Sequence, residues 1–258
     1  MATTDIPWAT MVWNAVTGCG GPDGEPCSYC YARRMSLRLA GRCGYPPHAP
    51  GSHPFDVTFH PDRLELPLKW KKPQRIFVNS MGDLFDPRVP ERWLSQVMTV
   101  MDRAKHHTFL VLTKQAERMM EYLQMVDALG GGAAPGHIWW GVSVEDQAAA
   151  DERLPFLLQA PVTNRFISAE PLLSEIDLSP AAAPYCWYNA AGDGAPVWRG
   201  PDWVVCGPQS GLGAKPYDFD WILSLRQQCV LAAVPFFLKG VEGYEKLDGW
   251  RQLPKGPK

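Results

Sequence analysis

Three cysteines lie close together near the start of the chain, in a segment rich in glycine. Cys19, Cys27 and Cys30 fall within twelve residues, with seven residues between the first two and two between the last two. Three thiolates on one loop are able to bind three irons of a [4Fe–4S] cluster and to leave the fourth iron open to a further ligand. The spacing therefore indicates metal or redox chemistry at this loop.

A structural zinc site is the alternative for the same thiols, because such a site takes four protein ligands. The segment that follows offers four candidates for the missing ligand: Cys43, His48, His53 and His60. A disulfide framework is less favoured. The chain has seven cysteines, an odd number, and clustered cysteines in a reducing compartment indicate metal binding more than disulfide pairing.

Composition sets the class of protein. The chain has 258 residues, 46% of them hydrophobic, which suffices for a large folded core. Its formal net charge is −2 and its pI is about 6.3, so any site for nucleic acid must be a local basic patch. No apolar run reaches the length of a membrane span, and the first residues lack the order of a signal peptide. We therefore expect a cytoplasmic protein with no membrane partner.

Short apolar runs alternate with longer amphipathic segments over most of the chain, a pattern typical of parallel βα units. The runs begin at Arg75, His107, His137, Asn164, Asp202 and Val234. The helical segments begin at Pro90, Lys114, Asp146 and Asp218.

A further strand is expected between Thr10 and Gly18, which brings the count to six or seven. Eight strands make a full barrel of about this length. The sequence therefore predicts an α/β fold, an incomplete TIM-like (β/α)6 barrel of parallel strands, in a single domain over residues 1–258. Two stretches rich in proline, at about 44–61 and 180–201, interrupt the alternation and are expected to be loop insertions.

Polar residues stand where successive strands are expected to end. In parallel α/β folds these ends meet at one face, which is where ligands bind. Each residue alone has a simpler explanation, such as an acid at a helix N-terminus or a solvated lysine. Together they favour a polar ligand site, formed by the cysteines with Ser80, Gly82, Asp83, Lys114, Ser143, Glu145, Ser168, Glu170 and the Gly207–Gly211 segment.

The cysteine motif resembles that of the radical S-adenosylmethionine (SAM) superfamily, whose signature ends in Cys-x-aromatic-Cys, here Cys27-Ser28-Tyr29-Cys30. The common form of that signature has three residues between the first two cysteines, and this chain has seven. A wider resemblance covers almost the whole chain and is to a phage- and prophage-associated family that distantly resembles spore photoproduct lyase. Its blocks are "WNAVTGC…CSYCYARRM", "FVNSMGDLFDPRVP", "FLVLTKQAERM", "WWGVSVEDQ", "RFISAEPLL", "WVVCGPQSG" and "PFFLKG". Gln209 stands where the family usually has glutamate.

The resemblance implies a radical SAM barrel with two cofactors, a [4Fe–4S] cluster and SAM. Cys19, Cys27 and Cys30 would bind the cluster, and the open iron would take the amino and carboxylate groups of SAM. A reduced cluster would then cleave SAM to methionine and a 5′-deoxyadenosyl radical that abstracts hydrogen from the substrate. An electron donor such as flavodoxin or ferredoxin is implied as a partner.

The resemblance also assigns roles to the polar strand ends. Tyr29 would pack beside the cluster and the adenine. Ser80, Gly82 and Asp83 would hold the methionine amino group, with Asp83 supplying the negative charge. The other contacts expected for SAM or the substrate are Lys114 to the carboxylate, Ser143 and Glu145 to the ribose, and Glu170.

Cys206 ends a strand at the same face, where a thiol is able to donate a hydrogen atom to a product radical. The simpler interpretation is a small buried hydrophobic residue. The catalytic interpretation is kept as a hypothesis.

Two basic patches indicate a possible nucleic-acid partner. Arg34, Arg38 and Arg42 recur every four residues and are expected to share one helix face. The second patch is Lys69, Lys71 and Lys72, with Trp70 among them. The alternative is that both are solvated charged surfaces. With the family resemblance, they lead to the hypothesis of a radical isomerase or lyase that rearranges a modified thymine or other pyrimidine in phage DNA. The competing hypotheses are radical modification of a peptide or small metabolite, and a DNA-binding module stabilised by zinc or a cluster.

Overall fold

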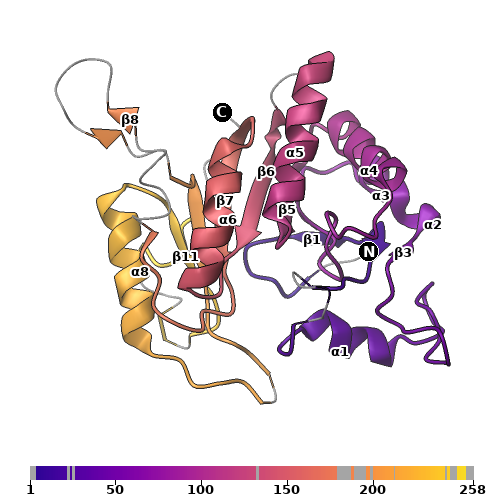
Figure 1. Cartoon of the computed structure of the whole chain (residues 1–258), viewed down its shortest axis with the longest axis horizontal. Coiled ribbons are helices and arrows are strands. Elements are labelled where there is room, and N and C mark those ends of the chain that lie inside the picture. Colours follow the sequence, from indigo (N-terminus) through magenta and orange to yellow (C-terminus); the bar gives the residue numbers. More distant parts are fainter. Residues whose placement is uncertain are drawn as a thin grey trace. The chain divides into compact units, whose positions relative to one another are not determined.

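A computed structural model of the chain (Figure 1) shows strands and helices in the alternation that the sequence predicts. The parts that the structure describes are residues 4–21, 24, 27–131, 134–178, 187–188, 196–197, 200–211, 213–241, 243–244 and 249–253.

Seven strands make up the main sheet: β1 (Met11–Trp13), β4 (Arg75–Val78), β5 (Thr108–Thr113), β6 (Ala134–Ser143), β7 (Val162–Ala169), β10 (Trp203–Cys206) and β11 (Phe236–Leu238). Two short antiparallel pairs stand apart from it: β2 (Val16–Thr17) with β3 (Thr58–Phe59), and β8 (Trp187–Tyr188) with β9 (Pro196–Val197).

The strand order of the main sheet is β1-β4-β5-β6-β7-β10-β11. The strands of this sheet therefore lie side by side in the order in which they occur along the chain. The pairs β1–β4, β4–β5, β7–β10 and β10–β11 are parallel. A doubly wound sheet would reverse direction at a switch point, whereas a barrel is built in this sequential order. In the described part of the chain the sheet ends at β1 and β11 and does not close on itself. This α/β fold is therefore consistent with a partial TIM-like barrel.

The helices lie between the strands, as βα units require. They are α1 (Tyr31–Arg38), α2 (Pro61–Leu64), α3 (Leu66–Lys69), α4 (Glu91–Arg103), α5 (Ala116–Val126) with a π-helical turn η1 (Asp127–Gly131), α6 (Gln147–Gln159) and α8 (Phe219–Leu231).

Helix α4 illustrates why these segments are helical. Pro90 precedes it as the N-cap, and Glu91 places a negative charge in the first turn, where the helix dipole favours one. Its buried residues recur at three- and four-residue spacing, which gives one apolar stripe. They are Leu94, Val97, Val100 and Met101.

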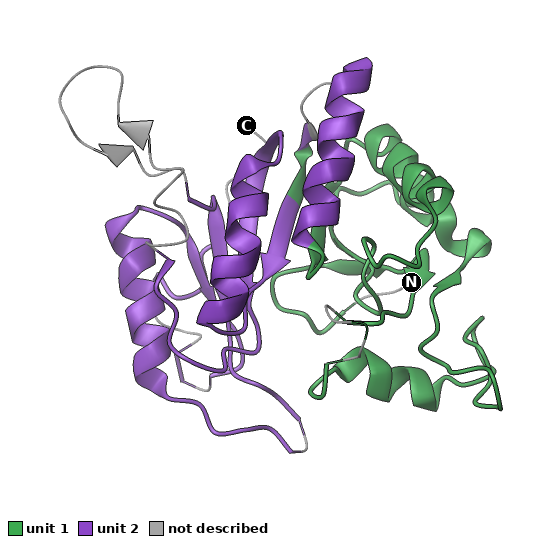
Figure 2. Ribbon diagram, viewed as in Figure 1, with its two compact units in different colours: residues 1–115, 137–139, 257 green, residues 116–136, 140–256, 258 purple. Residues whose placement is uncertain are grey.

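The described residues group into two compact units (Figure 2), and each is considered by itself below. Unit 1 comprises residues 1–115, 137–139 and 257, and its core is built on β1, β4 and β5. The rings of Trp13 and Phe109 have centroids 5.9 Å apart in that core, and both residues are fully buried.

Unit 2 comprises residues 116–136, 140–256 and 258, and its core is built on β7, β10 and β11. Phe166 and Trp203 are fully buried there, with ring centroids 5.8 Å apart.

Two predicted elements differ in detail from the structure, and a third lies mostly outside the described residues. The first expected strand is broken after Trp13, because Asn14 turns aside and accepts a hydrogen bond from the Met81 backbone at 2.9 Å. The predicted helical row of arginines is wrong in its last member, since α1 ends at Arg38 and Arg42 lies in the turn beyond it. Most of the insertion predicted at 180–201 lies outside the described residues.

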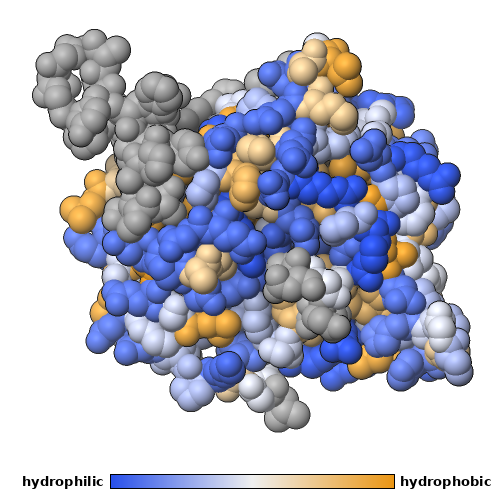
Figure 3. All heavy atoms as spheres, in the orientation of Figure 1, coloured by the Kyte–Doolittle hydropathy of each residue, from blue (hydrophilic) through white to orange (hydrophobic). Residues whose placement is uncertain are grey.

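Hydrophilic side chains predominate on the face shown in Figure 3, with hydrophobic ones scattered among them. Among the described residues, no helix is both long and apolar enough to cross a bilayer.

Candidate functional site: the cysteine loop of unit 1

The cysteine loop begins where two strand-end segments of unit 1 touch. Gly18 follows β2 with a φ of +86°, and its amide donates to Met81 O at 2.9 Å. Gly82, which follows β4, lies so close that a Cβ on it would stand 2.6 Å from Gly18 O. Only glycine fits at these two positions, because a Cβ on Gly82 would separate the two segments and a Cβ on Gly18 would collide with Asp56 O. Gly82 thus has a packing role in addition to the cofactor role predicted from the sequence.

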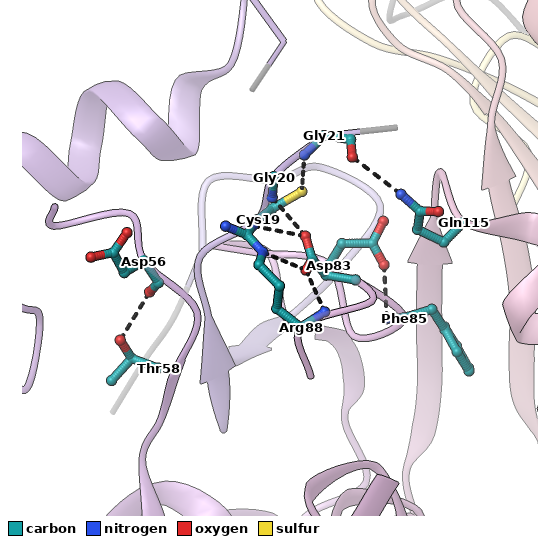
Figure 4. A network of polar contacts seen from close by, with 10 residues as sticks. Cys19, Gly20, Gly21, Asp56, Thr58, Asp83, Phe85, Arg88 and Gln115 are labelled. Carbon is teal, nitrogen blue, oxygen red and sulfur yellow. Dashed lines mark hydrogen bonds and ion pairs between the residues drawn. The ribbon is translucent and has the colours of Figure 1, made fainter. Parts of the chain in front are cut away.

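Backbone contacts hold the segment that carries Cys19 (Figure 4). The Gly20 amide donates to Asp86 Oδ2 at 2.6 Å, and the Gly21 amide donates to Cys19 Sγ at 3.1 Å. Gln115 Nε2 donates to Gly21 O at 3.2 Å. Successive peptides of the loop are therefore fixed by partners from the ends of β4 and β5. Hydrogen bonds to a sulfur ligand are also a means by which proteins tune iron–sulfur clusters.

The carboxylate of Asp86 is the centre of this network. It is 1% exposed and receives four donors: Gly20 N, Arg88 N at 3.0 Å, Arg88 Nε at 2.9 Å and Arg88 Nη2 at 3.0 Å. Burial opposes its ionisation, but the hydrogen bonds from Arg88 and Gly20 and the charge of Arg88 outweigh burial and hold the pKa of Asp86 below its ordinary value.

The other two cysteines lie at the start of α1. Cys30 is the N-cap of that helix, and its Sγ accepts from Arg33 N at 3.4 Å. The Cys30 amide donates to Cys27 O at 3.0 Å, which closes a turn around Tyr29. All three thiols are free and partly buried. Cys19 and Cys30 pack against the same cluster of buried residues, Ala32, Tyr45, Phe55 and Met81.

Electrostatics couple the three thiols. Burial raises the pKa of Cys19 well above the ordinary value, and Asp83, Asp86 and Cys30 raise it further. Burial likewise raises the pKa of Cys30, Cys27 adds to the increase, and the charge of Lys114 partly offsets it. The pKa values of Cys19 and Cys30 therefore both lie above the ordinary value, which favours the protonated form of these two thiols. A bound metal would supply the missing positive charge and displace those protons.

Asp83 joins the ends of β4 and β5. Its Oδ1 accepts from Thr113 Oγ1 at 2.7 Å and from Phe85 N at 2.9 Å, and its Oδ2 accepts from Lys114 N at 2.9 Å. Burial raises the pKa of Asp83, although these three hydrogen bonds oppose the increase. The carboxyl group predicted to bind the ammonium of SAM is thus also a structural link between two strand ends.

Lys114 and Tyr29 face each other across the site. Lys114 Nζ lies 3.0 Å from the Tyr29 hydroxyl and 5.4 Å from the centre of its ring. This pair brings the aromatic residue of the cysteine motif to the end of β5. It also places a cation next to Cys30.

Ser80 and Asn79 complete the β4 end. Ser80 Oγ donates to Asn14 Oδ1 at 3.3 Å, and its carbonyl accepts from the hydroxyl of Tyr31 on α1. Asn79 Oδ1 accepts from Val16 N at 3.3 Å, whereas its buried Nδ2 has no partner among the described residues. An unsatisfied buried donor costs about 1–3 kcal/mol, so this amide is a place where a bound molecule would stabilise the protein.

The remaining predicted cofactor contacts lie in unit 2, where they are paired with charged side chains. Glu145 Oε2 lies 2.9 Å from Arg153 Nη1, and both side chains are almost fully buried. The same Arg153 nitrogen donates to Ser143 O at 2.9 Å. Glu170 Oε1 lies 2.8 Å from Lys239 Nζ. The two acidic side chains at these strand ends, Glu145 and Glu170, are therefore each paired with a cation of the same unit.

Cys206, also in unit 2, is the last residue of β10 and is fully buried. Burial raises the pKa of its thiol well above the ordinary value, and Glu170 adds to the increase. This environment is typical of a structural cysteine.

Two of the three histidines weighed for a zinc site, His60 and His53, accept or share hydrogen bonds with other groups, whereas the ring of His48 lies against that of His53. His60 Nε2 lies 2.8 Å from Thr17 Oγ1 in the core, and burial lowers the pKa of His60 to about 4. His53 Nδ1 accepts from Phe55 N at 3.0 Å. Cys43 is exposed. In the described part of the chain, no three His, Cys, Asp or Glu side chains already have the arrangement of a metal site, and this holds for Cys19, Cys27 and Cys30 as well.

The two predicted basic patches lie at different ends of unit 1. Arg34 and Arg38 are exposed on α1, directly after Cys30, together with Arg33. In the described part of the chain, none of these three forms an ion pair. Lys69, Lys71 and Lys72 precede β4 and so lie at the opposite end of that strand from the cysteine loop. Trp70 is half-buried, with its ring against His107, rather than free to stack on a base.

Four residues of these networks were missed by sequence reasoning: Asp86, Arg88, Gln115 and Arg153. Asp86 and Arg88 had a weak signal, an acid and an arginine two residues apart just after a strand end. Gln115 and Arg153 had none, because their partners are set by tertiary contacts.

No curated protein and no solved structure gave a significant match to the chain. A family model described as "Protein of unknown function (DUF5131)" matches residues 3–255, so the chain belongs to that family.

Proposed function

We propose that the protein is a radical SAM enzyme whose cluster is bound by Cys19, Cys27 and Cys30. When bound, a [4Fe–4S] cluster with one open iron supplies the electron that cleaves the sulfonium of SAM to methionine and a 5′-deoxyadenosyl radical. One observation carries the proposal. Cys19 and Cys30, eleven positions apart in the sequence, pack against the same group of buried hydrophobic side chains at the strand ends of unit 1.

The residues present suit such a group in chemistry. The three thiols are free, they are partly buried and electrostatically coupled, and two of the sulfurs accept backbone N–H bonds. Two carboxylates, Asp83 and Asp86, surround Cys19 with negative charge that a metal centre would offset. The zinc alternative is less supported, because His60 and His53 are held by other partners.

The chain's own residues would orient SAM. The Lys114–Tyr29 pair presents a cation and an aromatic ring beside Cys30, which suits a carboxylate and an adenine respectively. Ser80 and Gly82 lie at the end of β4, beside the unpaired amide of Asn79. The predicted contacts of Ser143, Glu145 and Glu170 with SAM or substrate, and the hydrogen-donor role of Cys206, remain predictions.

The substrate we propose is a modified thymine or another pyrimidine in DNA, to be rearranged or isomerised. The support from unit 1 is the group of exposed, unpaired arginines on α1, which suits the phosphate backbone and lies next to Cys30 in the chain. A base extruded from the stack would reach a site at the strand ends. The lysines before β4 lie at the other end of the strand and are not part of this proposal.

Anaerobic reconstitution tests the catalytic part. The protein would be loaded with iron and sulfide, reduced, and incubated with SAM, with release of 5′-deoxyadenosine measured. We expect release from the wild type and from Cys43→Ala, a matched control in an exposed cysteine, and none from Cys19→Ala or Cys30→Ala. A wild type that binds one zinc and releases no 5′-deoxyadenosine would contradict the proposal.

The substrate is tested separately by mass spectrometry of nucleosides from DNA that carries modified thymines. We expect a modified nucleoside to change its mass or retention time only when the protein, SAM and reductant are all present. Release of 5′-deoxyadenosine without any change in the DNA would retain radical SAM chemistry and contradict the DNA substrate.

A further inference from the structure

We propose that Asp86 and Arg88 are positioning residues that hold the Cys19 segment in place and set the charge beside its sulfur. The charge effect depends on the proposed function, because it treats Cys19 as a cluster ligand. The positioning of the Cys19 segment does not depend on it.

The grip on the loop is direct. Asp86 Oδ2 accepts a hydrogen bond at 2.6 Å from the amide of Gly20, the residue next to Cys19. Arg88 donates to both oxygens of the same carboxylate through Nε and Nη2. Arg88 also covers Gly20, since a Cβ on that glycine would lie 2.8 Å from Arg88 Nη2. The Arg88 guanidinium, the Asp86 carboxylate and the Gly20 peptide therefore form one packed unit.

The position of Cys19 depends on contacts with residues distant in the sequence, whereas the position of Cys30 depends on contacts within its own helix and turn. Cys30 is held by local contacts of its own helix, through Arg33 N and the turn to Cys27. The Cys19 segment has no helix to hold it, and its fixed points come from residues about 65 to 95 positions later in the chain, Asp86 and Gln115. A residue that fixes a metal ligand in this way has a large effect on metal affinity.

The two charges act on the sulfur with opposite sign. Asp86 Oδ2 lies 2.6 Å from the amide nitrogen of Gly20, the residue next to Cys19, and Arg88 Nη2 lies 3.0 Å from the same oxygen, so both charges stand close to the cysteine. The Asp86 side chain is 1% exposed, whereas that of Arg88 is 51% exposed and therefore more screened by water. The carboxylate should dominate. Negative charge near an iron–sulfur cluster lowers its reduction potential.

The test compares four variants in the full-length protein: Asp86→Asn, Arg88→Gln, Arg88→Lys and the matched control Asp102→Asn. Asp102 also pairs with a basic side chain, Lys105 at 3.6 Å, but on the surface of α4. Three quantities are measured: the midpoint potential by redox titration monitored by EPR, the rate of iron loss to a chelator, and hydrogen exchange of the peptide containing Gly20 before cluster loading.

We expect Asp86→Asn to raise the midpoint potential, to speed iron loss by about 10- to 100-fold, and to speed exchange at Gly20. Arg88→Gln should shift the potential the other way and by less, because a positive charge is removed from a more exposed place. Arg88→Lys should keep the midpoint potential close to that of the wild type, because the positive charge remains. It should resist iron loss less well than the wild type, since lysine cannot make the two hydrogen bonds of the guanidinium. Asp102→Asn should change none of the three.

Shifts of the potential in the same direction for Asp86→Asn and Arg88→Gln, or shifts no larger than that of Asp102→Asn, would overturn the charge effect. Unchanged exchange at Gly20 in Asp86→Asn would overturn the positioning role. If the wild type takes up no cluster, the proposed function fails, and the exchange measurement on the unloaded protein still decides the positioning role.

Discussion

The strand ends of the two units carry similar residue types but use them differently. In unit 2 the acids are matched with cations, Glu145 with Arg153 and Glu170 with Lys239. In unit 1 the carboxylates of Asp83 and Asp86 lie near Cys19, and the charge of Lys114 only partly offsets the rise in the pKa of Cys30. Buried nitrogens without a partner among the described residues occur in both units, such as Asn79 Nδ2 in unit 1 and Arg226 Nε in unit 2. Neutralised polar groups stabilise a fold, whereas uncompensated groups at a strand end are where a ligand gains binding energy. We therefore expect a ligand to gain more binding energy at the thiols of unit 1 than at the ion pairs of unit 2.

The largest effect is expected from Cys27→Ala. The variant should lose the cluster completely, because two thiols cannot hold a [4Fe–4S] cluster against exchange with solvent. Iron and sulfide analysis after reconstitution measures this. A variant that retains the iron content and visible spectrum of the wild type would show that Cys27 is not a ligand, and Cys229→Ala in α8 serves as the control for a distant cysteine.

The next effect concerns the buried pair of unit 2. Arg153→Met leaves Glu145 buried without its partner and should lower the free energy of unfolding by about 3–5 kcal/mol. Chemical denaturation measures the loss. Adding Glu145→Gln to the same chain should recover much of it, since the uncompensated charge is then gone. A single variant as stable as the wild type would contradict the view that these charges serve the fold.

Acid should lower the stability of the folded protein through His60, which is hydrogen-bonded to Thr17 just before the cysteine loop. The pKa of His60 is lowered from 6.5 to about 4 in the folded protein, so the unfolded state binds the proton first as pH falls. The contribution of His60 to stability is therefore fully present above pH 6.5 and falls between pH 6.5 and 4, by about 3–4 kcal/mol at most.

Denaturation midpoints between pH 7 and 4.5 for the wild type and His60→Gln test this dependence. The fall should be smaller in the variant, in which residue 60 no longer titrates. Identical pH profiles for the two proteins would remove His60 from the account.

The smallest effect is expected at α1. Arg34→Glu with Arg38→Glu should weaken binding of duplex DNA by about tenfold or more at moderate salt and reduce the salt dependence of binding. Lys71→Glu with Lys72→Glu is the matched control at the other end of β4 and should have less effect. Equal losses for both pairs would mean that DNA contacts unit 1 without preference for the end that carries the cysteine loop.

Much of the fold followed from local pattern. The runs at Arg75 and His107 are strands because continuous apolar residues suit a sheet covered on both faces, and α4 begins after the expected proline. Local pattern could not show that Asn14 would break the first strand, or that α1 would end before Arg42, since both depend on tertiary contacts and chain reversal.

The cysteines of the candidate site could be found from the sequence, whereas most of the residues that hydrogen-bond to the cysteine loop could not. Close spacing exposed the cysteine motif, and the rule that ligands bind at strand ends singled out Asp83 and Lys114. Sequence spacing carries no information on pairs such as Gly20 with Asp86 or Glu145 with Arg153, because the folded chain brings them together.

The most direct test of the central claim is the EPR spectrum of the reduced, reconstituted protein with and without SAM. The account predicts about four irons per chain and a spectrum that changes when SAM binds the open iron, with both properties lost in Cys30→Ala. A spectrum that SAM leaves unchanged, or a chain that holds a single zinc ion, would contradict it.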